Sequence, residues 1–452
     1  MEKELRDEPA LAPPNTGNGN GTDYMTQAEV DAAMAGLPAN DRRGPFYPFT
    51  FRNFRLFFYG QTISVAGTWM QTVAQQWLVW KLTGSAAWLG IVSGASAIPY
   101  VLFATWGGQV ADRYPRRDTL VWTQTAAMIL AFVLAFLTYG WWIPVQPWHV
   151  ALLAGLSGIV NAFNMPTQQA FITDMVDDRK ALGSAIALNS FRFNMARILG
   201  PIFAGVVLVK WGAATCFLIN GLSFIAVIIS LLMMRLPPFV PHAQQISMWG
   251  GFGYIWRNRS VFRTVALIGA ASLFAWSVST LYPVFATLFH RGARGYSNIL
   301  SVNGVGAATG GLTLAILGER LSRRKAIYGG AFLYGSMLLM LSFAPTYAWV
   351  LFSLACSGFA MISLGISCNT KVQEEVPDAL RGRVMAVYSL VFSGLMPVGG
   401  LEIGFLAEHL KAVTAVQINA SVFLFLTTTL LVWSLIDARA FERAAEQYDP
   451  TG

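Results

Sequence analysis

Three ionisable side chains lie inside long apolar stretches of the chain: Arg192, Arg197 and Glu402. A charged side chain in a lipid interior is costly, so it usually faces water, a partner or a ligand. We therefore regard Arg192 and Glu402 as candidates for binding a substrate and for handling protons. A structural pair that lines a cavity, or for Glu402 a side chain that reaches the membrane surface, is the alternative. Arg197 stands beside Gly200 and Pro201, which suggests a tether or a gate.

Two pairs of amide side chains are also spaced to act together. Gln71 and Gln75 are four residues apart, as are Asn164 and Gln168. Residues with this spacing share one face of a helix, and amides donate and accept hydrogen bonds without carrying charge. These four residues are candidates for contacts with a substrate or with protons, with polar contacts between helices as the alternative.

Residue patterns of enzymes and metal sites are absent from the sequence. The cysteines lie in apolar stretches without paired spacing, and the histidines lie in loops or at segment ends without ligand spacing (Cys216, Cys356, Cys368; His149, His242, His290, His409). There is no nucleophile elbow and no phosphate-binding loop. We therefore expect no enzyme activity, no metal, no cofactor and no ATP-driven pumping.

The composition indicates that these candidates are positioned by elements in a membrane. Of the 452 residues, 55% are hydrophobic and 12% are charged, whereas a soluble domain carries about 25% charged residues. The net charge of +8 comes from short basic clusters between apolar runs, which argues against a nucleic-acid partner. Four aromatic residues could stack on a ligand or anchor the chain in lipid (Trp69, Trp77, Trp276, Tyr282).

Apolar segments follow one another from Leu56 onward, each long enough to cross a hydrocarbon core of about 30 Å. They predict an all-α integral membrane protein with twelve transmembrane helices. The expected spans are 56–80, 85–111, 118–140, 148–172, 183–209, 212–235, 261–289, 297–318, 325–345, 347–370, 384–408 and 412–436.

The widest polar interruption begins at Pro237 and divides the spans six and six. We expect a disordered tail (1–47), a first six-helix bundle (48–236), a linker (237–259), a second six-helix bundle (260–436) and a C-terminal tail (437–452). The tail is rich in Pro, Gly and Asn, which cannot bury enough apolar surface to offset the entropy lost on ordering. No cleaved signal peptide is apparent.

Basic residues are distributed unequally between the two sets of loops. Sixteen Lys and Arg lie on the side of the termini and five on the other side (Lys81, Lys210, Arg291, Arg294, Lys411). Basic loops stay in the cytoplasm, so we expect both termini there.

The two halves carry an internal repeat. Residues 111–117 match residues 318–324 at an offset of 207, with an acid, an Arg and then an Arg pair in each. After the fourth and tenth spans, Asp174 matches Glu374 at an offset of 200. Equal halves of six spans are typical of parallel repeats that enclose a substrate site between them.

With this repeat and its loop motif, the sequence resembles the major facilitator superfamily. Further strings resemble its transmembrane secretion effector branch, which includes enterobactin exporters and macrolide efflux proteins: Gly67-Thr68-Trp69-Met70-Gln71, Leu82-Thr83-Gly84-Ser85, Ala187-Leu188-Asn189-Ser190, Ala196-Arg197-Ile198-Leu199-Gly200-Pro201 and Arg381-Gly382-Arg383-Val384-Met385. The resemblance covers about residues 48–436. It implies two six-helix bundles around a central cavity, in a bacterial inner membrane.

The resemblance also implies a conformational latch on the side of the termini, which holds the two halves together in the outward-facing state. Asp112 ends the second span, where the helix dipole disfavours a carboxylate, so Arg381 and Arg383 are candidate partners. A solvated salt bridge is the alternative. The latch residues are Gly108, Asp112, Arg113, Arg116, Arg117, Glu319, Arg320, Arg381 and Arg383.

The fifth span resembles the antiporter signature of the superfamily at Gly200, Pro201 and Gly205. Small residues let helices approach closely, and proline permits a bend. Ordinary helix packing is the alternative.

These features favour a secondary active transporter that exports an amphipathic small molecule, such as a siderophore, drug or secondary metabolite, in exchange for protons. A monomer is sufficient for this mechanism. An importer or facilitator of the same fold, or a membrane sensor or scaffold that does not transport, remains an alternative.

Overall fold

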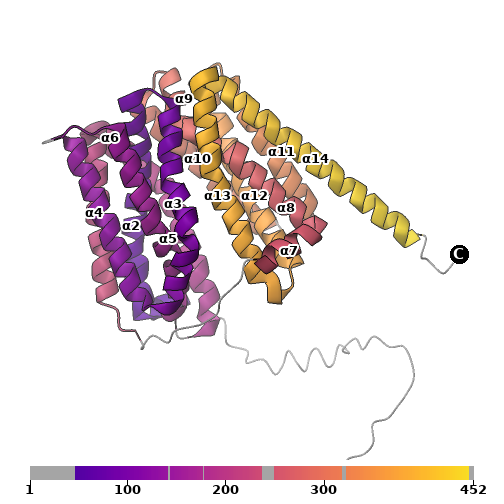
Figure 1. Cartoon of the computed structure of the whole chain (residues 1–452), viewed down its shortest axis with the longest axis horizontal. Coiled ribbons are helices and arrows are strands. Elements are labelled where there is room, and N and C mark those ends of the chain that lie inside the picture. Colours follow the sequence, from indigo (N-terminus) through magenta and orange to yellow (C-terminus); the bar gives the residue numbers. More distant parts are fainter. Residues whose placement is uncertain (1–45, 141–142, 177, 237–248, 318–321, 447–452) are drawn as a thin grey trace, which may run out of the picture. The chain divides into compact units, whose positions relative to one another are not determined.

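The computed structural model describes residues 46–140, 143–176, 178–236, 249–317 and 322–446, and within those ranges it contains helices and no strands. Figure 1 traces them in chain order. They are η1 (Tyr47–Thr50), α2 (Arg52–Thr83), α3 (Ala86–Arg113), α4 (Arg116–Tyr139), α5 (Pro147–Asp174), α6 (Arg179–Leu232), α7 (Trp249–Arg257), α8 (Arg259–Ala270), η2 (Ala271–Ala275), η3 (Trp276–Leu281), α9 (Tyr282–Leu288), α10 (Gly292–Leu317), α11 (Arg323–Ser342), α12 (Tyr347–Glu375), α13 (Asp378–Leu410) and α14 (Ala412–Glu446).

Nine helices in the described ranges are long and apolar enough to cross a membrane, whereas the sequence predicts twelve spans. One of the nine, Ala181–Leu232, contains two predicted spans, because Gly212 has φ 82° and breaks α6. Helices α2 and α11 are not among the nine, although they have 32 and 20 residues. Polar side chains such as Gln61 and Gln71 lower the hydropathy of α2, and the buried Gln61 shows that some of them face the interior.

The predicted boundaries differ from the helices in the linker and near the C-terminus. Residues 1–45 of the predicted tail and residues 237–248 of the linker lie outside the described residues. The end of the linker forms α7, and α14 continues to Glu446, into the predicted C-terminal tail. The Asn53 side chain donates to the Arg235 carbonyl at 2.7 Å, so the start of α2 lies beside the end of α6. We call this side of the helices, next to the linker, the linker side, and the other the far side.

The same contacts recur in the two halves at the offsets seen in the sequence. A Cβ at Gly158 of α5 would clash with the Ser96 carbonyl of α3, and one at Gly358 of α12 would clash with the Asn303 carbonyl of α10. The glycines are 200 positions apart and the carbonyls 207. Absence of a side chain lets each helix pair approach closely. The repeat is therefore present in the packing as well as in the sequence.

Two ion pairs on the linker side repeat in the same way. Arg116 bonds Asp174 at 2.5 Å in the first half, and Arg323 bonds Glu374 at 2.6 Å in the second. Each pair ties the helix after the repeated loop motif to the end of the helix that packs beside it. These arginines therefore hold their own half together.

The predicted seventh span is irregular along its length. It runs as α8, a π-helical turn (η2), a 3-10 turn (η3) and α9. The Gly399 Cα of α13 lies against the Leu273 carbonyl in the π-helical turn, where a Cβ would clash. Single π-helical turns inside helices are frequently found at functional sites. Here the turn precedes Trp276 and Tyr282, which are both buried.

Candidate functional site

The first contact between the two halves joins α3 to α13 at the far side. Gly90 of α3 lies against the Gly400 carbonyl, and Gly404 of α13 lies against the Ala86 carbonyl, with no space for a Cβ at either glycine. Glu408 accepts hydrogen bonds from the Ser85 hydroxyl at 2.9 Å and from the Ala87 N–H at 3.2 Å. A carboxylate at a helix N-terminus is favourable, because it satisfies free N–H groups and complements the helix dipole.

The second contact joins α6 to α10. Ser297 donates to the Pro201 carbonyl at 2.6 Å, and Gly205 leaves room for the Ser297 side chain. Gly200 packs against Trp69 of α2, within the first half. The three residues of the predicted antiporter signature therefore lie at close helix contacts, two of them between halves.

Aromatic residues extend the contact between halves on the far side. Trp80 donates to the Thr287 hydroxyl at 2.7 Å. Trp77 stacks on Tyr296 with ring centroids 6.2 Å apart and planes tilted by 21°. These pairs join α2 to α9 and α10, and Trp77, one of the four aromatic candidates, here packs against a residue of the other half.

Arg197 reaches across to the second half from the middle of α6. Its Nη2 donates to the Met361 sulfur at 3.7 Å, and its guanidinium carbon lies 6.0 Å from the centre of the Trp69 ring. The Tyr282 and Tyr334 hydroxyls are close enough to interact with it electrostatically. Arg197 is partly exposed. It therefore lies where residues of α6, α2, α9, α11 and α12 converge.

Arg192 lies inside the first half and does not reach the second. It is 4% exposed, and its Nη2 donates to Asn189 at 2.6 Å. Its guanidinium carbon lies 5.4 Å from the centre of the Phe57 ring of α2. The Nε and Nη1 atoms are buried without a hydrogen-bond partner. Arg192 therefore does not face lipid, and in this conformation it is closed to a substrate.

Glu402 is bound to its own half. Its carboxylate accepts from the Asn419 amide of α14 at 3.0 Å, and Asn419 is fully buried. Glu402 lies within α13 and is partly exposed. The structure does not bring Glu402 together with Arg192, which is in the other half.

One amide of each predicted pair bonds to a neighbouring helix. Gln71 accepts from Asn220 at 2.7 Å, and Asn164 accepts from Thr123 and Gln124, both at 3.2 Å. No hydrogen bond of Gln75 or Gln168 is found among the described residues. The sequence did not predict the partners Asn220, Thr123 and Gln124, because no sequence pattern indicates which polar residue of another helix will contact a given amide. Gln61 was missed too, although it is buried with an unpaired amide nitrogen.

Among the described residues, the predicted pairing of Asp112 with Arg381 or Arg383 is not formed in this conformation. Asp112 has no hydrogen bond or ion pair in the described part of the chain, while Arg381 donates to the Gln373 carbonyl at 3.0 Å. Of the other candidates, Arg113 is exposed, and Gly108 has open space where a Cβ would be. Arg116 pairs with Asp174, and Arg117 pairs with Asp118. Arg383 lies against Gly250. Glu319 and Arg320 lie outside the described residues.

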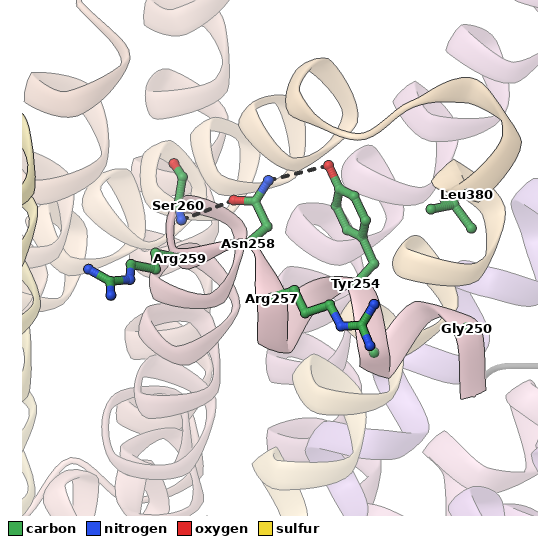
Figure 2. A pocket seen from close by; sticks show the side chains of 8 residues that line it. Gly250, Tyr254, Arg257, Asn258, Arg259, Ser260 and Leu380 are labelled. Atoms are coloured by element: carbon green, nitrogen blue, oxygen red, sulfur yellow. Dashed lines mark hydrogen bonds between the residues drawn. The ribbon is translucent and has the colours of Figure 1, made fainter. Parts of the chain in front are cut away.

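An open depression on the linker side is lined by α7, the start of α8 and Leu380 of α13 (Figure 2). In it, Asn258 donates to the Tyr254 hydroxyl at 3.3 Å and accepts from the Ser260 N–H at 3.1 Å. Its lining residues come from the linker helix and the second half. The described residues that line it include none of the first half.

Comparison with known proteins relates this arrangement to transporters. A family model described as transmembrane secretion effector matches residues 43–450. The staphyloferrin A transporter of Staphylococcus aureus is 26% identical over 78% of this chain and 89% of its own length. Macrolide efflux protein A of Streptococcus pyogenes is 22% identical over 84% of this chain and 95% of its own.

The fold also matches a solved structure. A bacterial homolog of the human lysosomal transporter Spinster, in an inward-facing and unoccupied conformation, superposes with a TM-score of 0.64. The two share 13% identity, and the match covers 85% of this chain and 93% of the other. At this identity the likeness concerns the fold.

Proposed function

Because the chain belongs to the transmembrane secretion effector family of the major facilitator superfamily, we propose that it exports an amphipathic small molecule by proton-driven alternating access. Relatives named for staphyloferrin A transport and macrolide efflux support this substrate class. Glu402 is our candidate for proton exchange, because it is a carboxylate within a span and not at its end.

The observation that carries the proposal is the one-sided distribution of contacts between halves. Between α3 and α13 the contacts extend from the Ser85–Glu408 pair to the Val101–Gly394 pair. Between α6 and α10 they include the pairs Pro201–Ser297 and Ile198–Gly304. All these residues lie in the far-side or middle part of their helices. Among the described residues, the repeated ion pairs of the linker side, Arg116–Asp174 and Arg323–Glu374, each stay within one half. Such a pattern is that of a carrier closed on the far side.

We place the linker side in the cytoplasm, because its loops carry most of the basic residues. The conformation is then inward-facing. Opening to the outside requires the α3–α13 and α6–α10 contacts to separate, while the linker-side ends approach. In that second state Asp112 would meet Arg381 or Arg383, which gives the predicted latch its role. A contact present in one state alone shifts the equilibrium toward that state.

The test uses inverted membrane vesicles with an acidic interior and a panel of a macrolide, a carboxylate siderophore and a cationic dye. We expect uptake of at least one compound, and loss of uptake when the proton gradient is dissipated. Uptake by right-side-out vesicles alone would indicate an importer. Failure to move any compound in either orientation would contradict transport of these classes.

A matched pair of variants connects transport to the contacts between halves. Gly90→Val places a side chain against the Gly400 carbonyl and should prevent far-side closure. Gly183→Val places the same side chain in open space on α6 and should leave uptake unchanged. Equal uptake by the two variants would contradict the rocking mechanism.

A further inference from the structure

Arg197 has hydrogen-bond donors to spare at the surface where the halves meet. A guanidinium carries five N–H donors, and in the described part of the chain the recorded acceptor is the Met361 sulfur. Sulfur is a weak acceptor. In Arg192 the Nε and Nη1 atoms are buried without a hydrogen-bond partner, whereas the same atoms of Arg197 are not buried in this way. The remaining donors of Arg197 are therefore accessible.

No carboxylate of the described residues compensates this charge. Arg263 of α8 pairs with Asp437, and Arg116 pairs with Asp174, whereas the described residues offer neither Arg197 nor Arg192 an acidic partner. Glu402 is bound to Asn419. An arginine in the membrane interior without a counter-ion is unfavourable until an anion or water approaches it.

The surroundings of Arg197 are aromatic and come from both halves. Trp69 lies beside it in the first half, and Tyr282 and Tyr334, 4% and 2% exposed, lie near it in the second. Aromatic rings offer large apolar contact area, and tyrosines add a hydroxyl that can bond a polar group. The site combines one accessible cation with apolar walls.

We propose that Arg197 binds the carboxylate of an aromatic or amphipathic organic anion, and that this anion is the substrate class of the protein. The inference rests on the proposed transport function and assigns its substrate contact. Arg197 and Trp69 belong to the first half and Met361 and the two buried tyrosines to the second, so an anion bound to Arg197 lies where the halves meet. The binding role that the sequence suggested for Arg192 passes to Arg197, because Arg192 is enclosed.

The test compares two probes that differ in charge and little else, 2-naphthoate and 2-naphthamide, by calorimetric titration of the purified full-length protein. A charge-assisted hydrogen bond in a partly buried site should make naphthoate bind about tenfold more tightly than naphthamide. Arg197→Gln should abolish this preference and retain naphthamide binding, which shows that the variant is folded. Arg197→Lys should restore part of the preference. Arg257→Gln, the same charge change in the depression outside the interface, should retain all of it.

Three results overturn the inference: equal binding of the two probes by the wild-type protein, no binding of naphthoate, or a preference that survives Arg197→Gln but disappears in Arg192→Gln. Vesicle uptake of naphthoate separates this inference from the transport function. Arg197-dependent binding without uptake in either vesicle orientation supports the anion site and contradicts transport. Proton-driven uptake of other compounds that is unaffected by Arg197→Gln supports transport and contradicts the anion site.

Discussion

The Glu408 carboxylate accepts a hydrogen bond from the Ser85 hydroxyl across 323 positions of sequence. It also accepts from the Ala87 N–H, so a side chain of the second half caps a helix of the first. A cap of this kind stabilises a helix by about 1 kcal/mol. Here it also stabilises the far-side-closed arrangement, because the two partners separate when that side opens.

Glu408→Ala should therefore shift the population toward the far-side-open state by up to about fivefold, the equivalent of one lost cap. The measurement is the distance distribution between spin labels at Lys81→Cys and Leu410→Cys, with the three native cysteines replaced by alanine. His409→Ala is the matched control, since the His409 ring bonds its own helix at the Phe405 carbonyl. An unchanged distribution in Glu408→Ala would show that the cap does not contribute to closure.

Asp112→Asn should act on the opposite state. If Asp112 pairs with Arg381 or Arg383 when the linker-side ends approach, loss of its charge removes a charge-assisted bond and lowers the far-side-open population by roughly tenfold. Transport should fall while protein abundance holds. The readout is spin-label distance on the linker side together with vesicle uptake. Asp118→Asn, which removes a carboxylate bound to the adjacent Arg117, is the control. Normal uptake together with normal distances in Asp112→Asn would contradict the latch hypothesis.

Glu402→Gln should weaken the dependence of uptake on the proton gradient and leave substrate binding largely intact. A glutamine oxygen can still accept from Asn419, so the substitution removes the proton-binding group and keeps the bond between α13 and α14. The measurement is uptake at equal substrate concentration with and without a gradient. Full gradient dependence in the variant would assign Glu402 a packing role.

The orientation can be tested with single cysteines on opposite sides. A cysteine at Ser322, next to α11, should react with membrane-impermeant thiol reagents after the cytoplasmic side is opened. A cysteine at Gly292, at the start of α10, should react in intact cells. The reverse pattern would place the basic loops outside the cell and invert the proposed transport direction.

The fold and the repeat could be predicted because they depend on patterns along the chain. Lipid requires long apolar helices, and the repeated acid and arginine motifs locate corresponding points in the two halves. The family was confirmed by a match to residues 43–450. The offsets of 200 and 207 matched Asp174 with Glu374 and the two loop motifs with each other, and the structure adds that these matched residues form equivalent ion pairs.

The candidate site was harder to predict, because hydropathy does not say which way a side chain of a helix points. Arg192 and Arg197 are five residues apart in one apolar segment. Arg192 is enclosed in its own half, and Arg197 faces the second half. This difference depends on how α6 packs on α2 and α10. Glu408 was missed because a charged residue at the end of a span is typical of a solvated loop, and nothing in the local sequence identifies Ser85 as its partner.

The uncompensated charge of Arg197 has a consequence for how the protein responds to membrane voltage. A unit charge that crosses the whole membrane field changes energy by about 2.3 kcal/mol per 100 mV. Whenever the empty halves rearrange, Arg197 moves relative to part of that field without a neutralising carboxylate among the described residues. A bound monoanion would cancel the charge of Arg197, so this residue would contribute much less to the voltage sensitivity of the loaded protein than to that of the substrate-free one. Through Arg197 the membrane potential would then act mainly on the step in which the carrier returns without substrate.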